Sequence, residues 1–370
     1  MSAIRKLLIL DGIAGAPLGR ELQEAFQESG VETAHVDCLQ QAMKPLYGVR
    51  SAWAKLRNRE SGGDSFYFLP RLLEKDLRAW LACEQPSHIL VVGFIYKFFD
   101  PALLRRLADE AGIALLLYDT DTCNLYDRRR EFIFFIEREL PVYQHIFSFS
   151  RVTTRFFQDT RQLSASFLPF GAKPIAGLPA ASDDKPLDAL FVGSCDLRRI
   201  FLLEGIRDHV SIRGNRWRRN LPLMSAPLRQ RVDDRPVWGA ELHQMLDQAK
   251  IVLNITRTDF HGAETGINLR IFEALAAGCF LLTDHCDELA TLFALGEEIE
   301  TYRSAAELGE KVRHYLAHTE ARSRIANQGH AAFRASHTWK HRVADILHFL
   351  QHGQPQGGSS HLPADADGGH

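Results

Sequence analysis

The sequence predicts an α/β protein built from two doubly wound domains in tandem, facing a shared cleft. Apolar segments of strand length alternate with amphipathic segments of helix length, which is typical of parallel sheets covered by helices on both faces. The alternation stops at the Gly-, Pro-, Ser- and Asp-rich segment 171–188 and then restarts, which indicates a domain boundary. Ligands bind at the carboxyl edge of open parallel sheets, so the cleft is the expected site.

The first domain is expected to span residues 1–172. Its expected strands are 6–10, 31–36, 88–92, 114–118 and 145–149, and its expected helices are 18–29, 70–83, 101–111, 128–140 and 152–159. In the aromatic helix 128–140, core packing of Phe132, Phe135 and Ile136 is favoured over an acceptor-facing surface or peripheral membrane contact. Residues 42–64 show no clear period and are expected to form an irregular insertion.

The second domain is expected to span residues 187–336. Its expected strands are 189–192, 210–213, 251–255 and 279–283, and its expected helices are 197–208, 241–248, 268–277, 307–317 and 320–332. A last helix follows at 337–350, with Thr338 as a plausible N-cap. The tail 351–370 is rich in Gly, Pro, Ser, Asp and His and is expected to be disordered.

Composition narrows the class of protein. The formal net charge of −2 argues against a nucleic-acid partner, and the short basic patch at Arg213, Arg216, Arg218 and Arg219 is better explained by phosphate binding or by a solvated loop. The six cysteines are scattered, which disfavours a disulfide framework or a zinc site. No run approaches the roughly 20 apolar residues of a membrane helix, and the first apolar run is short. A cytoplasmic location is therefore expected.

The segment 261–284, HGAETGINLRIFEALAAGCFLLTD, carries the clearest chemical signal. It is expected to form a loop, a helix that ends before Gly278, and a buried strand that ends at Asp284. Glu273 lies in the middle of the apolar helix, where a carboxylate needs a partner. A glycine-containing loop that enters a helix offers backbone N–H groups to phosphate. Together these features suit a nucleotide sugar.

This segment resembles the nucleotide-sugar motif of the GT-B glycosyltransferases, closest to the branch of group 1 transferases similar to the spore maturation protein CgeB. The matching residues are Gly266, Asn268, Arg270, Phe272, Glu273, Ala274, Ala277, Gly278 and Leu281 to Asp284. Further similar pieces follow in the same order, namely FVGS at 191–194, IRGNRW at 212–217, AKIVLNI at 249–255 and HTWKHR at 337–342. The resemblance implies two Rossmann-like domains, with the acceptor on the first, the donor on the second and the last helix crossing back.

The resemblance also implies roles for individual donor-site residues. It assigns the ribose hydroxyls of the donor to Glu273. Many retaining relatives carry a second glutamate eight positions earlier, where this chain has Thr265, and Glu264 is one residue off that pattern. Arg270 is either a diphosphate contact or an ion-pair partner of Glu273. The other expected donor-binding residues are Gly193, Ser194, Arg198, Gly214, Gly266 and Asn268.

Aspartates at the ends of apolar strands are the candidates for catalysis. Asp119 and Asp121 form an Asp-x-Asp after such a strand, a pattern that binds a divalent metal in GT-A enzymes. We favour contact with the acceptor, with one of them as general base, over a metal site; a plain structural turn is the other alternative. Asp11 and His261 are weaker candidates of the same kind. Neither a metal nor a cofactor is expected.

The expected function is transfer of a sugar from a nucleotide-diphosphate sugar to a glycan or protein acceptor. Two alternatives stay open. One is a nucleotide-sugar epimerase on the same fold, which would need no acceptor. The other is a non-catalytic nucleotide-sugar-binding or partner protein, which the threonine at position 265 makes conceivable.

Overall fold

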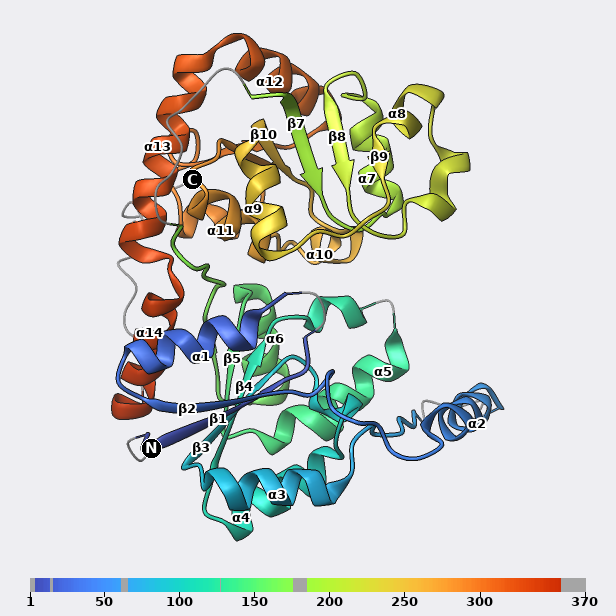
Figure 1. Ribbon diagram of the computed structural model, residues 1–370, viewed down its shortest axis with the longest axis vertical. Helices are drawn as coiled ribbons and strands as arrows, with labels where there is room; N and C mark the ends of the chain where they lie inside the picture. The colour runs from blue at the N-terminus through green and yellow to red at the C-terminus, as the bar shows by residue number, and fades with distance from the viewer. Residues whose placement is uncertain (1–3, 14–15, 61–65, 127, 176–184, 354–370) are drawn as a thin grey trace, which may run out of the picture.

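The computed structural model describes residues 4–13, 16–60, 66–126, 128–175 and 185–353, with side chains of 58–60 left aside. Figure 1 shows two α/β domains stacked along the long axis. Each contains a six-stranded sheet whose pairings are all parallel, in the orders β2-β1-β3-β4-β5-β6 and β12-β11-β10-β7-β8-β9. The predicted fold class, two doubly wound α/β domains, is confirmed.

In the first domain the strands are β1 Lys6–Asp11, β2 Glu32–Asp37, β3 His88–Val92, β4 Ala114–Asp119, β5 His145–Ser148 and β6 Ala165–Phe167. The α-helices are α1 Leu18–Glu28, α2 Tyr47–Glu60, α3 Glu74–Glu84, α4 Pro101–Glu110, α5 Arg129–Phe134 and α6 Arg151–Arg161. Short helical turns are η1 Ile95–Lys97, η2 Thr122–Leu125, η3 Phe135–Glu139 and η4 Leu140–Val142. The strand β6 was not predicted, because three residues on a sheet edge carry little periodic signal.

In the second domain the strands are β7 Leu187–Val192, β8 Val210–Arg213, β9 Val232–Asp233, β10 Ala249–Asn254, β11 Leu281–Asp284 and β12 Glu300–Tyr302. The helices are α7 Leu197–Glu204, η5 Arg218–Leu223, α8 Ala226–Gln230, α9 Gly239–Asp247, α10 Thr258–Gly262, α11 Leu269–Ala276, η6 Asp287–Thr291, α12 Ala305–Ala317 and α13 Thr319–Ser336. The last helix, α14 Trp339–His352, lies against the first domain. Of the predicted disordered tail, 354–370 lies outside the described residues.

Burial on both faces explains the continuous apolar strands. Along β1, Leu7 and Ile9 pack in one hydrophobic cluster with α1, while Leu8 and Leu10 pack in a second cluster on the opposite face. Side chains alternate between the two faces of a strand, so every position must be apolar. The aromatic helix follows the same logic, because Phe135 and Ile136 are buried and Phe132 packs against the second cluster, as predicted.

The segment 42–64 departs from its prediction. It contains the helix α2, which projects sideways from the first domain, whereas an irregular insertion was predicted. The prediction was wrong because the apolar residues with helical spacing, Val49, Trp53 and Leu56, are few and lie among polar residues and Gly48, so their period was not recognised. Residues 61–65 lie outside the described part of the chain.

Two segments connect the domains, and they cross side by side. The amide of Trp339 donates to the carbonyl oxygen of Ala172 at 3.2 Å. A Cβ on Gly171 would lie 2.9 Å from the Trp339 nitrogen, so only glycine allows this approach. Helix α14 then lies against α1 (Figure 1), where the Trp339 indole donates to Glu21 at 2.5 Å. Residues 176–184 of the linker are outside the described residues.

Candidate functional site

A cavity of about 340 Å³ lies between the two domains, at the carboxyl ends of their strands. The first domain contributes residues that follow β1 and β4, and the second contributes the loops after β7, β8 and β10 together with the start of α11. Its lining includes Thr120, Asp121, Asn124, Gly193, Ser194, Arg199, Gly214, Thr256, Arg257, Asn268, Arg270 and Glu273. Six of the predicted donor-binding residues, Gly193, Ser194, Gly214, Asn268, Arg270 and Glu273, therefore lie at one cavity.

Gly214 allows the loops after β7 and β8 to touch. Its φ is 148°, and a Cβ there would lie 1.9 Å from the carbonyl oxygen of Gly193. That oxygen also accepts a hydrogen bond from the indole of the buried Trp217 at 2.9 Å. At this wall of the cavity the backbones of Gly193 and Gly214 contact each other directly, with no side chain between them.

We expect Gly214→Ala to lower the free energy of unfolding by more than about 2 kcal/mol, because backbone must move to admit the methyl group. Gly239→Ala is the matched control, since Gly239 also has a positive φ, of 56°, but has open space around its Cβ position. The control should lose only about 1 kcal/mol. Denaturant unfolding of the two variants checks this, and equal losses would contradict a steric role for Gly214.

The carboxylate of Glu273 and the guanidinium of Arg270 form an ion pair at 2.7 Å on the cavity side of α11. Burial raises the pKa of Glu273, and the neighbouring Arg270 opposes that rise. The predicted ion pair therefore exists, and both side chains also line the cavity.

The start of α11 is capped by its own sequence. The side-chain oxygen of Asn268 accepts from the Arg270 amide at 3.1 Å, and its side-chain nitrogen donates to Asn254 at 3.0 Å. Asn268 thus satisfies one backbone N–H of the helix end and anchors it to the end of β10.

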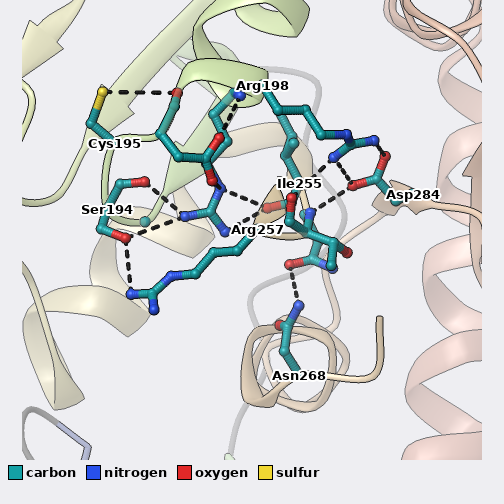
Figure 2. A network of polar contacts seen from close by, with 12 residues as sticks. Ser194, Cys195, Arg198, Ile255, Arg257, Asn268 and Asp284 are labelled. Atoms are coloured by element: carbon teal, nitrogen blue, oxygen red, sulfur yellow. Dashed lines mark hydrogen bonds and ion pairs between the residues drawn. The ribbon is translucent and has the colours of Figure 1, made fainter. Parts of the chain in front are cut away.

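Two adjacent arginines at the start of α7 have different surroundings (Figure 2). Arg198 lies outside the cavity lining and forms a bidentate pair with Asp284 at 2.9 and 2.6 Å. Arg199 lines the cavity, but it donates to the carbonyl oxygens of Ser194 and Ile255, and burial lowers its pKa to about 10. The sequence prediction chose Arg198, whereas the structure places Arg199 at the cavity.

The loop before α11 does not bring all its candidate residues to the cavity. Glu264 is exposed with a φ of 57°, and His261 is exposed on α10. Thr265 is buried and donates to Glu288 at 2.7 Å, while Gly266 packs beneath Cys286. Within the described residues, these four are absent from the cavity lining.

Asp11 and Asp119 are buried in local hydrogen-bond networks outside the cavity lining. Asp11 accepts from the amides of Ile13 and Gly19 at 2.9 and 3.1 Å, at the start of α1. Asp119 accepts from the amide and hydroxyl of Thr122 and from Ser148 at 2.8 Å. Burial raises the pKa of Asp119, and these bonds oppose the rise. These contacts match the structural-turn alternative.

Asp121 is the predicted catalytic residue that lines the cavity. Burial raises the pKa of its carboxyl group to about 6, against the opposing charges of Lys97 and Arg257. It accepts a hydrogen bond from Asn124 in η2. A carboxylate with this pKa, at the wall opposite α11, can take a proton near neutral pH.

Arg257 is the cavity residue that sequence reasoning missed. Its guanidinium donates to Asn124 of the first domain at 2.6 Å. It also donates to Ser194 of the second domain at 3.0 Å (Figure 2). Both hydrogen-bond partners are neutral, and the guanidinium also interacts electrostatically with the carboxyl group of Asp121, whose pKa it lowers. The hydroxyls of Thr120 and Thr256 also line the cavity and are buried without a hydrogen-bond partner among the described residues. The position of Arg257 just after β10 was the available signal.

Glu288 joins the domains beside the cavity. Its carboxylate accepts from the hydroxyl of Ser150 at 2.9 Å and the amide of Val152 at 3.1 Å, both in the first domain. It also accepts from Thr265 in the second domain. The residue therefore holds the start of α6 against the loop that precedes α11.

In the part of the chain that the structure describes, no group of three or more His, Cys, Asp or Glu side chains is placed to hold a metal ion. Among the described helices, none is long and apolar enough to cross a bilayer.

Comparison with known proteins gives a family match for part of the chain and structures of similar fold. Residues 198–348 match the family described as Glycosyl transferase-like. No curated protein matches the chain by sequence. A sucrose-phosphate synthase from Thermosynechococcus elongatus has a similar structure, with a TM-score of 0.60 and 13% identity over 94% of this chain and 98% of that chain.

Two further solved structures are similar at a TM-score of 0.60. HepE from Anabaena, in complex with UDP and glucose, is 10% identical over 94% of this chain and 100% of its own. An alpha-glucosyltransferase in complex with UDP and a DNA 13-mer is 10% identical over 95% of this chain and 100% of its own. At these identities the comparison establishes the fold, which is the GT-B fold.

Proposed function

We propose that this protein is a glycosyltransferase that moves a sugar from a nucleotide-diphosphate sugar to a glycan or protein acceptor. The observation that carries the proposal is the cavity between the domains, with Glu273 and Arg257 on one side and Asp121 on the other. The glycosyl transferase-like match and the UDP complexes of HepE and alpha-glucosyltransferase support a nucleotide-sugar donor. The quoted motifs support placement in the CgeB-like branch.

Four polar groups at the cavity have a proposed task. Glu273 accepts hydrogen bonds from the ribose hydroxyls. Arg257 and the hydroxyl of Thr256 bind the diphosphate, whose negative charge grows as it leaves. The transfer breaks the bond between the anomeric carbon and the diphosphate oxygen and forms one to an acceptor oxygen. Asp121 takes the acceptor proton, and we propose that the cationic side chain lets the step proceed without a metal.

Glu273→Gln should weaken nucleotide binding about ten- to a hundredfold, because a charge-assisted hydrogen bond contributes roughly 1.5–3 kcal/mol. The measurement is thermal unfolding of the wild type and the variant against UDP, dTDP, GDP, ADP and CMP. Ligand at a hundred times its dissociation constant adds about 2.7 kcal/mol and should raise the wild-type melting temperature by several degrees.

The matched control measures the affinity for the nucleoside that corresponds to the nucleotide found to bind. If Glu273 holds the ribose, its replacement should weaken nucleoside and nucleoside diphosphate by the same factor. Arg270→Gln breaks the same ion pair and keeps the carboxylate, so it separates ribose binding from local packing. Unchanged nucleotide affinity in Glu273→Gln would overturn the assignment.

A non-catalytic nucleotide-sugar-binding protein is the second candidate. It is favoured by Thr265, which is bonded to Glu288 where many retaining enzymes have a glutamate, and by the exposure of Glu264. Release of free nucleoside diphosphate from the matching nucleotide sugar, with an acceptor library present, distinguishes the two. Binding without any turnover would support the second candidate.

A further inference from the structure

Helix α2 carries an apolar surface that the fold leaves exposed. It projects from the side of the first domain in Figure 1. Val49, Trp53 and Leu56 are 72%, 62% and 53% exposed, and Leu46, just before the helix, is 77% exposed. Exposing several large apolar side chains together is unfavourable, so a contiguous surface of this kind indicates an interaction site.

The exposed residues share one face of the helix. The positions 46, 49, 53 and 56 are spaced by three and four residues, which places them along one stripe. The opposite side is fixed to the domain, because Ala54 is buried and the Tyr47 hydroxyl donates to the carbonyl oxygen of Leu69 at 3.2 Å. The apolar stripe is therefore presented by a projecting helix that Tyr47 attaches to the domain at its first residue.

Basic residues border this stripe. Arg50 and Arg57 lie next to it on the helical projection, and the Arg57 guanidinium lies 5.8 Å from the centre of the Trp53 ring. No Asp or Glu occurs between Asp37 and Glu60, whereas Lys44, Arg50, Lys55 and Arg57 are all basic. The local positive charge contrasts with the formal net charge of −2 for the whole chain.

The charge decides between possible partners. Two copies of α2 packed stripe to stripe would bring their arginines together, which is repulsive. A membrane surface with anionic headgroups accepts the arginines and lets the apolar side chains enter the acyl boundary. Tryptophan is enriched at that boundary because its ring is apolar and its N–H is polar.

A second element projects on the same side of the molecule. In Figure 1 the segment of η5 and α8 extends from the second domain in the same direction as α2 extends from the first. Arg216, Arg218 and Arg219 are exposed there, and Leu223 is 58% exposed. One flat anionic surface could then contact both domains.

We propose that α2 docks this protein on an anionic lipid bilayer, with Trp53 and Leu56 inserted at the boundary and Arg50 and Arg57 on the headgroups. This surface is separate from the donor cavity, so its test does not depend on the proposed transferase activity.

The test is co-sedimentation of the full chain with vesicles of phosphatidylcholine alone or mixed with phosphatidylglycerol. The wild type should bind the mixed vesicles and release them at high salt. Arg50→Gln combined with Arg57→Gln should weaken binding about thirtyfold, from the contribution of two basic residues near such a surface. Trp53→Ser combined with Leu56→Ser should weaken it about tenfold or more.

Phe201→Ser is the matched control, since Phe201 is 66% exposed on α7 of the other domain and should leave vesicle binding unchanged. Nucleotide-dependent thermal unfolding should be the same in all these variants. Three results would overturn the proposal: no binding to the mixed vesicles, equal binding to neutral vesicles, or binding that survives both double substitutions. Self-association in lipid-free ultracentrifugation, abolished by Trp53→Ser with Leu56→Ser, would assign the stripe to a second copy instead.

Discussion

Arg257→Gln should lower affinity for the nucleoside diphosphate about ten- to a hundredfold and turnover about a hundred- to a thousandfold. The guanidinium lines the cavity and, among the described residues, donates hydrogen bonds to the neutral Asn124 and Ser194, so we expect it to contact the diphosphate. The loss of turnover exceeds the loss of affinity because the diphosphate gains charge as it departs. Calorimetric titration and steady-state release of nucleoside diphosphate measure the two effects.

Two controls separate charge from positioning. Asn124→Ala removes the hydrogen bond to the first domain and keeps the guanidinium, so it should lower nucleotide affinity much less than Arg257→Gln. Arg257→Lys keeps the charge but not the planar donors and should fall between them. Nucleoside affinity should stay at the wild-type value in Arg257→Gln. If Asn124→Ala lowered nucleotide affinity as much as Arg257→Gln does, Arg257 would act by holding the two domains together.

Asp121→Asn should reduce turnover about a hundred- to ten-thousandfold while nucleotide affinity changes little, because the amide cannot take the acceptor proton. In the wild type, kcat/KM should rise with pH through about 6 and then level off, as the carboxyl group of raised pKa ionises. The pH profile of transfer checks this. A rising limb that persists near pH 6 in the variant would assign the ionisation to another group.

The same carboxyl group affects stability in the opposite direction. Its pKa of about 6 in the folded protein is above the 3.8 of an ordinary aspartate, so the folded state binds more protons between those values. Its contribution to stability is therefore lost as pH rises through this window. Asp121→Asn should flatten the decline, which denaturant unfolding at several pH values measures. Asp119→Asn serves as a comparison, because that residue has four hydrogen-bond donors around it and should mainly lose stability.

The fold could be predicted because its determinants are local and repeated. Strands buried on both faces must be apolar throughout, as in β1 with Leu7 to Leu10, and that pattern is visible in sequence. The strands β6, β9 and β12 have three, two and three residues and were missed, since their pairing depends on a neighbouring strand rather than on their own composition. Helix α2 was missed for a different reason, because its helical spacing rests on few apolar residues, Val49, Trp53 and Leu56, in a polar segment.

The site was only partly predictable. Glu273 stood out because a carboxylate in an apolar helix is unusual, whereas Gly214 was expected at the site through the resemblance of its motif. Arg198 and Arg199 could not be distinguished, because which one reaches the cavity depends on Asp284, eighty-six positions from Arg198 along the chain. Asp119 and Asp121 could not be distinguished from sequence either. Hydrogen bonds from Thr122 and Ser148 hold the Asp119 carboxylate away from the cavity lining.

The paired crossing of the chain at Ala172 and Trp339 limits how the domains can move. Because the two chain segments that connect the domains lie side by side there, we expect the domains to rotate about this crossing rather than slide past each other. The bonds of Glu288 to Ser150 and of Arg257 to Asn124 span the domains, so a swing that opens the cleft must break or stretch them. Nucleotide entry and product release then require a small number of interdomain hydrogen bonds to break and re-form.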